Sequence, residues 1–224
     1  MIPWEEIDRA EVPGHEGEVT LLKRGTEFSI RTAGTELMNS RLHGSEDTLG
    51  ELTYSRIKRK FGLRILIGGL GMGYTLAAAL EQSEPDTLIT VSELIPAVVR
   101  WNREHLGHLT GMPLDDPRVS VEEEDVVETI RKRKSVWDAI LLDVDNGPDG
   151  LTRKANDRLY CRSGLKTSFS ALRPGGFLAV WSSGADEAFT RRLKQGGFQT
   201  ETLTVPARKS GKGGRRTIWL AGKP

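Results

Sequence analysis

The sequence predicts an α/β protein with a doubly wound, mainly parallel sheet of seven strands. Three observations predict this fold class. Apolar runs alternate with helix-like segments, a glycine cluster follows the first central run, and two final strand-like segments are joined by a short loop. Continuous apolar runs are typical of strands buried on both faces, and right-handed crossovers place helices on both sides of such a sheet.

The first 60 residues are expected to form a separate, small β-rich segment with a linking helix. Residues 1 to 17 show no regular pattern and are expected to be irregular. Residues 18–25 and 27–32 alternate apolar with polar residues, which predicts two strands around a turn, and residues 34–40 allow a third. Residues 45–59 open with Ser-Glu-Asp, which predicts a helix with Ser45 as its N-cap.

Residues 61–224 are expected to form the second, larger domain. Its buried strands are predicted at 63–68, 87–93, 118–124, 137–144 and 176–182. The helices between and after them are predicted at 72–82, 97–107, 126–133, 164–175 and 187–197, the fourth being ended by Pro174-Gly175. Residues 198–205 and 215–222 predict a final antiparallel hairpin.

Composition excludes several classes of protein. The chain has 224 residues with 32 basic and 31 acidic side chains, so no overall field favours nucleic acid as a partner. Its single cysteine, Cys161, excludes an internal disulfide framework and a cysteine-based zinc cluster. No apolar run approaches the ~18 residues of a membrane span. We therefore expect a cytoplasmic protein that uses no metal and does not bind membranes.

The glycine cluster in ILIGGLGMGYT (65–75) predicts a ligand site. Gly69, Gly71 and Gly73 fall in the first turn from a parallel strand to a helix, where ligands of such sheets bind. Glycine lets a ligand approach the backbone, and the helix behind it offers free amide donors. The spacing GxGxG departs from that of dinucleotide sites, and a tight turn without a ligand is the alternative.

Acidic residues end the next two strands. Glu93 lies 20 residues after Gly73, where a carboxylate accepts hydrogen bonds from a ribose diol, either of NAD or of an adenosyl thioether. Glu124 and Asp125 end the third strand, where the adenine amino group of a thioether is expected. The alternatives are a solvated acid at Glu93 and a helix N-cap at Asp125.

Five motifs together resemble the spermidine synthase-like family, the polyamine aminopropyltransferase branch of the class I S-adenosylmethionine-dependent methyltransferase fold. They are IGGLGMG, VSELIPAVVRWN, DDPRVSVEEED, WDAILLDVDNGPDG and ALRPGGFLAVWS, and the similarity extends over residues 18 to 200. The resemblance implies a Rossmann-like domain, a shortened N-terminal β-domain and a homodimer. It also implies that an amine attacks the methylene carbon beside the sulfonium of decarboxylated S-adenosylmethionine.

The acidic loop 142–150 is where the resemblance places the chemistry. Asp143 and Asp145 lie two residues apart, on the same side of an extended chain. We expect Asp145 to be the base and Asp143 to orient the cofactor or the amine. Members of the family usually have acids three residues apart, so this loop is shorter. Acids that only cap backbone amides are the alternative.

The acceptor is expected to be a small molecule, an amine. In the family a Tyr-His-Glu or Tyr-Gln-Glu phrase seats it, and here residues 49–54 offer Glu51 as the acid and Tyr54 as the nearest aromatic residue. Trp181, at the end of the fifth strand, is expected to line the substrate pocket. The altered phrase keeps two other hypotheses open. One is a methyltransferase that uses intact S-adenosylmethionine, and the other is a non-catalytic ligand-binding module.

Overall fold

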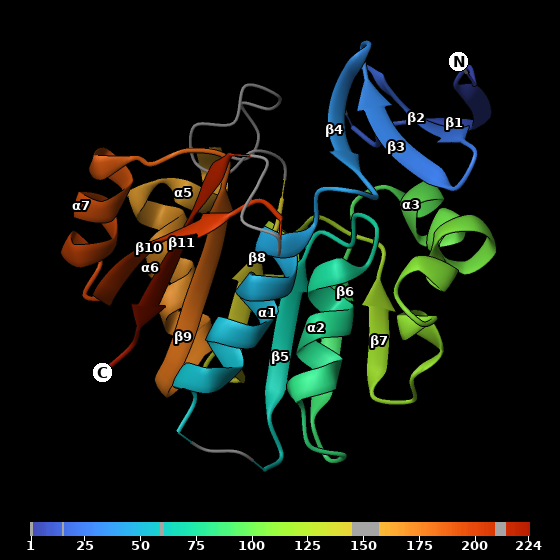
Figure 1. Cartoon of the computed structure of the whole chain (residues 1–224). Helices are drawn as coiled ribbons and strands as arrows, with labels where there is room; N and C mark the ends of the chain where they lie inside the picture. The colour runs from blue at the N-terminus through green and yellow to red at the C-terminus, as the bar shows by residue number, and fades with distance from the viewer. Residues whose placement is uncertain (1, 15, 59–60, 145–156, 209–213) are drawn as a thin grey trace.

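Two β-sheets and seven α-helices make up the described part of the chain (Figure 1). The computed structural model describes residues 2–14, 16–58, 61–144, 157–208 and 214–224. The larger sheet has seven strands in the order β10-β11-β9-β8-β5-β6-β7, and the smaller one has four in the order β1-β2-β3-β4. The predicted fold class is therefore confirmed.

The seven-stranded sheet is parallel except at one strand. Its members are β5 (Arg64–Gly68), β6 (Leu88–Ser92), β7 (Val119–Glu122), β8 (Trp137–Leu142), β9 (Leu172–Ser182), β10 (Gln199–Pro206) and β11 (Arg215–Gly222). β11 runs antiparallel to both of its neighbours, β9 and β10. The chain proceeds outward from β5 through β6 to β7 and then returns to β8 on the other side of β5. The order thus reverses between β5 and β8, which is where ligands bind in open α/β sheets.

Helices cover both faces of this sheet. They are α1 (Gly44–Arg56), α2 (Tyr74–Gln82), α3 (Pro96–Trp101), α4 (Val126–Arg131), α5 (Asp157–Tyr160), α6 (Arg162–Ala171) and α7 (Glu187–Gln195). One hydrophobic core holds buried residues of α1, α2 and α3, and a second holds those of α4, α6 and α7. Along β8, Ala139 and Leu141 join the first core, whereas Ile140 and Leu142 join the second. This alternation explains why β8 is apolar at both faces.

The small sheet packs on the helical segment after β6. It consists of β1 (Glu5–Glu11), β2 (Glu18–Arg24), β3 (Glu27–Thr32) and β4 (Thr35–Asn39). The indole Nε1 of Trp101 donates a hydrogen bond of 2.7 Å to Asp8, and the ring of Phe28 contacts that of His108. Buried residues of β2 and β3 belong to the same core as α1 and α2. α1, from the predicted first segment, also packs against α2, from the predicted second domain. The domain boundary at residue 60 stays a prediction.

Three local predictions are wrong. Residues 5–11 form β1 rather than an irregular lead-in. This edge strand is charged and half-exposed, so its residues show no strand pattern, and its pairing with β2 holds it in place. His43, not Ser45, is the N-cap of α1, and the Ser45 hydroxyl donates to Glu46 instead. Pro174 and Gly175 lie within β9, where a shift in its register with β8 accommodates them, and α6 ends earlier.

Candidate active site

The glycine loop after β5 is held against the end of β8. Gly69, Gly71 and Gly73 have φ of +87°, +54° and +84°, which favour glycine. A Cβ on Gly69 would lie 2.5 Å from the carbonyl oxygen of Asp143, a backbone atom. Close packing of two backbone segments is thus sufficient reason for glycine here, and ligand binding at this loop stays a prediction.

Glu93 ties the glycine loop to the segment after β6. Its carboxylate is buried, and its two oxygens accept hydrogen bonds from the backbone N–H groups of Leu70 at 2.8 Å and Ile95 at 2.9 Å. Glu93 is therefore not a solvated strand-end acid. These two bonds fix the carboxylate beside the glycine loop, and its contact with a ribose diol stays a prediction.

The acids after β7 have structural partners. Asp125 is the N-cap of α4, and its Oδ1 accepts from the N–H of Val127 at 2.9 Å, as the alternative interpretation expected. Glu124 accepts from Thr129 at 2.9 Å and pairs with Lys132, whose hydrogen bond lowers the pKa of Glu124. These interactions do not test whether Asp125 or Glu124 contacts adenine. That contact stays a prediction.

Asp143 and Glu46 form the chemically most unusual pair among the described residues. The Thr75 hydroxyl donates to Oδ2 of Asp143 at 2.6 Å. Burial raises the pKa of Asp143 to about 6, although the hydrogen bond from Thr75 by itself lowers this pKa. Burial, and then the negative charge of Asp143, raises the pKa of Glu46 to about 7. Two acids that titrate near neutral pH suit proton transfer or the binding of a cation.

These two acids line one cavity. It lies where β4, the start of α1, the glycine loop and the ends of β8 and β9 meet, and its other lining residues are Leu37, Met38, Asn39, Leu70, Gly71, Met72, Tyr74 and Trp181. The structure therefore brings together Asp143, Gly71 and Trp181, as predicted. The indole Nε1 of Trp181 is buried without a hydrogen-bond acceptor among the described residues.

Glu51 and Tyr54 do not lie in this cavity. They follow Glu46 along α1, and Glu51 is exposed. Burial raises the pKa of Tyr54, and the negative charges of Glu84 and Asp86 raise it further. These two acids precede β6, so they and Tyr54 lie at the opposite end of the sheet from the cavity. The predicted base Asp145 lies outside the described residues. Glu46 is the site residue that sequence reasoning missed; its signal was an acid in the first turn of the linking helix.

The raised pKa of Glu46 predicts a pH-dependent stability. Between about pH 4.5 and 7 the folded protein binds a proton at Glu46 that the unfolded chain releases, so the free energy of unfolding falls as the pH rises through this window. We expect Glu46→Gln to remove up to about 3 kcal/mol of this fall. Urea unfolding at pH 5 and pH 8 measures it. Glu51→Gln, an exposed change on the same helix, is the control, and an equal pH dependence in Glu46→Gln and wild type would refute the assignment.

Two kinds of structure are absent from the described residues. None of their helices is long and apolar enough to cross a membrane. They also contain no group of three or more histidine, cysteine, aspartate or glutamate side chains that could hold a metal ion.

Comparisons with known proteins support the predicted resemblance. The chain is 33% identical over 120 residues to Polyamine aminopropyltransferase 2 of Pseudomonas aeruginosa, which covers 52% of the chain and 32% of that protein. It is 27% identical over 117 residues to the Polyamine aminopropyltransferase of a Synechococcus species, covering 52% and 36%. The matches thus span about a third of the length of these curated relatives. The chain matches no protein-family model.

Solved structures agree on the fold. The spermidine synthase of Thermotoga maritima superposes with a TM-score of 0.78 at 18% identity, over 98% of this chain and 73% of that one. A spermidine synthase in complex with the transition-state analogue AdoDATO gives 0.76 at 17% identity, over 98% and 72%. A probable spermidine synthase from Corynebacterium glutamicum gives 0.67 at 15% identity, over 98% and 79%. The predicted resemblance to the spermidine synthase-like family and its methyltransferase-like fold is therefore confirmed.

Proposed function

We propose that this chain is a spermidine synthase-like transferase, which moves an aminopropyl group from decarboxylated S-adenosylmethionine to a small amine. The observation that carries the proposal is the pair Asp143 and Glu46 in one cavity at the switch point of the sheet, bordered by the glycine loop. The curated relatives named polyamine aminopropyltransferase support the same reaction.

The reaction requires a deprotonated amine beside a cationic sulfur. The nitrogen lone pair attacks the methylene carbon, the carbon–sulfur bond breaks with its electrons going to sulfur, and methylthioadenosine leaves. The attacking nitrogen must also release a proton. In this proposal Asp145 accepts that proton, and Asp143 and Glu46 hold the ammonium before attack.

The charges of the cavity favour a donor without a carboxylate. With a pKa of about 6, Asp143 is mostly ionised at neutral pH. The carboxylate of intact S-adenosylmethionine would lie beside this charge, a repulsion of a few kcal/mol if the site is dry. Decarboxylated S-adenosylmethionine brings an ammonium and a sulfonium but no carboxylate. Glu93 is proposed to hold its ribose, and Glu124 and Asp125 its adenine edge.

Asp145 remains our proposed base, with Asp143 as the acid that orients donor or amine. The Thr75 hydroxyl donates to Oδ2 of Asp143 at 2.6 Å, which fixes the orientation of this carboxylate. Glu51 and Tyr54 are not proposed as amine contacts in this geometry, and Glu46 takes their place.

Product analysis tests the proposed reaction. Purified protein is incubated with decarboxylated S-adenosylmethionine and a panel of primary amines, and in parallel with intact S-adenosylmethionine. We expect methylthioadenosine from the first mixture and no S-adenosylhomocysteine from the second. S-adenosylhomocysteine alone would identify a methyltransferase, and neither product, with saturable binding, would identify a binding module.

We also propose a cytoplasmic homodimer, as the family resemblance implies. The chain mass is 24.8 kDa, so light scattering on a size-exclusion column is expected to give about twice that value. A monomeric mass at micromolar concentration would contradict this part of the proposal.

A further inference from the structure

Two cavities flank α6 on the face of the sheet that is opposite to the Asp143 cavity. α6 itself has the sequence RSGLKTSFSA, with two basic residues and no acidic one. One cavity lies between α4 and α6, and the other between α6 and α7. The residues under both belong to the second hydrophobic core, whereas Trp181 and the glycine loop belong to the first.

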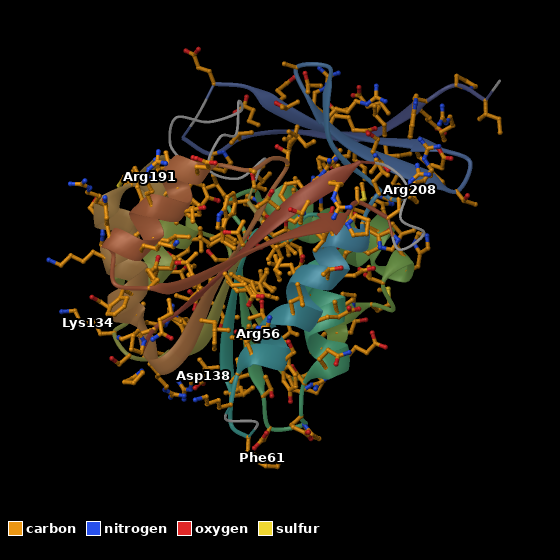
Figure 2. The ribbon with its side chains drawn as sticks, turned by 60° about the vertical axis from the view of Figure 1, so that its left-hand side comes forward. Arg56, Phe61, Lys134, Asp138, Arg191 and Arg208 are labelled. Carbon is orange, nitrogen blue, oxygen red and sulfur yellow. The ribbon has the colours of Figure 1, made fainter. Side chains whose placement is uncertain are left out.

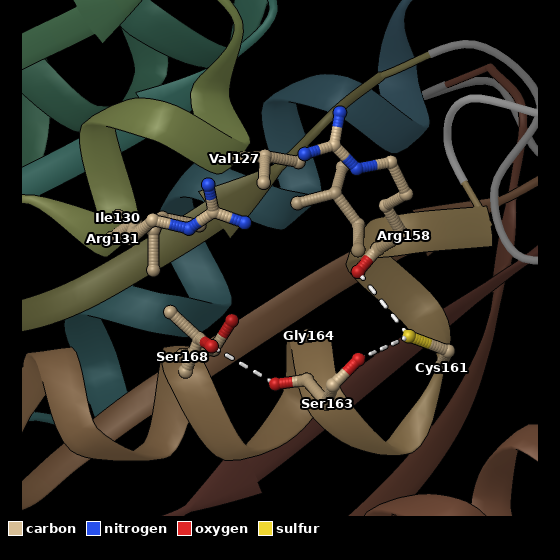
Figure 3. Close-up of a pocket in the computed structure, with 10 residues that line it drawn as sticks. Val127, Ile130, Arg131, Arg158, Cys161, Ser163, Gly164 and Ser168 are labelled. Atoms are coloured by element: carbon tan, nitrogen blue, oxygen red, sulfur yellow. Dashed lines mark hydrogen bonds between the residues drawn. The ribbon is translucent and has the colours of Figure 1, made fainter.

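Figure 3 shows the cavity between α4 and α6. Its volume is about 120 Å³, and Arg131 and Arg158 line it. Both arginines pair with Glu128, at 3.2 and 3.4 Å. The Cys161 thiol in the same cavity contacts Ser163 at 3.0 Å. An anion bound here would have to compete with the Glu128 carboxylate for the two arginines.

The cavity between α6 and α7 differs in charge and in size. Its volume is about 590 Å³, and Arg162, Lys166 and Arg192 line it without any acidic residue. Arg192 pairs with Asp186 at 3.2 Å. Arg162 donates to the uncharged Gln195 at 3.2 Å. Within the described residues, neither Arg162 nor Lys166 has a carboxylate within 4.0 Å.

The two cations of this cavity without a carboxylate partner among the described residues come from one helix, α6. Arg162 and Lys166 are four residues apart on α6, so their side chains lie on the same side of the helix. Arg191 of α7, labelled in Figure 2, pairs with Glu187 at 3.7 Å and does not line the cavity.

The carbonyl groups at the end of α7 do not cancel this charge. The N–H of Gly196 bonds to the carbonyl oxygen of Arg192 at 2.9 Å, and the N–H of Gly197 bonds to that of Lys194 at 3.1 Å. These oxygens therefore already accept hydrogen bonds. Besides the guanidinium and ammonium groups, the side chains of Gln195 and Ser170 line the cavity.

We propose that the cavity between α6 and α7 binds a small molecule with two or more phosphate groups, at a second site separate from the transfer site. Guanidinium groups bind phosphate with two parallel hydrogen bonds, and a lysine ammonium adds a point charge. Arg162 and Lys166 are two cations without a carboxylate partner among the described residues, and Arg192, which pairs with Asp186, lies beside them. Two such cations match a diphosphate better than a single phosphate. A volume of about 590 Å³ falls within the range of sites for small ligands.

Calorimetric titration of the full chain with inorganic pyrophosphate tests the site at low salt. We expect saturable binding with one ligand per chain, and an affinity at least ten times weaker in Lys166→Glu. Lys166 is exposed, so the substitution leaves the fold intact. Arg191→Glu, the same charge reversal on α7 at a residue that does not line the cavity, is the matched control and is expected to change the affinity less than threefold.

A second arm replaces pyrophosphate with ADP to distinguish a free diphosphate from a nucleotide. Equal affinities would show that the diphosphate is the whole ligand, and a tighter ADP complex that Lys166→Glu also weakens would show a nucleotide. No binding of either probe would overturn the proposal. Equal losses in Lys166→Glu and Arg191→Glu would overturn it too, because they would show unspecific attraction to the basic flank. Transfer activity is not a readout, so failure here leaves the proposed function untouched.

Discussion

Asp143→Asn is expected to lower kcat for aminopropyl transfer by roughly 100-fold, the scale for loss of a group that orients the reactants. The amide has the size of the carboxyl and still accepts the hydrogen bond that Thr75 donates at 2.6 Å. The fold and the glycine loop should therefore remain in place. What disappears is the negative charge beside Glu46, together with any proton transfer that depends on it.

Steady-state kinetics with decarboxylated S-adenosylmethionine measures this loss. Asp186→Asn is the matched control, because Asp186 is also a buried acid close behind a strand end, where it caps α7. Asparagine is an equally good N-cap, so its kcat should stay close to that of wild type. A kcat of Asp143→Asn within about threefold of wild type would remove Asp143 from the chemistry.

Gly69→Ala is expected to be the most disruptive single-methyl change at the site. The added Cβ would lie 2.5 Å from the carbonyl oxygen of Asp143, so one of two backbone segments must move. The residue also has a φ of +87°, which strains alanine by itself. We expect a loss of about 2 to 4 kcal/mol in the free energy of unfolding and of measurable cofactor binding.

Gly111→Ala separates the two causes. Gly111 has a similar φ of +77°, but a Cβ there would meet no atom within 4 Å. Its cost should be about 1 kcal/mol, the backbone strain alone. Denaturant unfolding of both variants gives the difference, which is the cost of the contact with Asp143. Equal losses in the two variants would show that the glycine loop and the end of β8 are not tightly packed.

Strand pattern and loop position were readable from the sequence because burial on two faces leaves a plain signal. The apolar run at 137–144 predicted β8. Asp143 stands at the end of this run, and the structure places it beside the glycine loop. These elements meet because parallel strands end at the same edge. β1 gave no such signal, since its charged residues face solvent and its order comes from pairing with β2.

The helix that carries Glu46 shows why the amine site was harder to predict. Glu46 and Glu51 are five residues apart, which places them about 140° apart around a helix, so only one can face the cavity. Tyr54 lies about 12 Å further along the axis than Glu46. Which face of α1 turns to the cavity depends on packing against α2, and this information is spread over distant parts of the chain.

The central claim is that the cavity with Asp143 and Glu46 receives a donor without a carboxylate. Parallel calorimetric titrations with decarboxylated and intact S-adenosylmethionine at neutral pH test it most directly. The proposed function predicts that the decarboxylated form binds at least ten times more tightly. Tighter binding of the intact form would contradict it and indicate methyl transfer on the same fold.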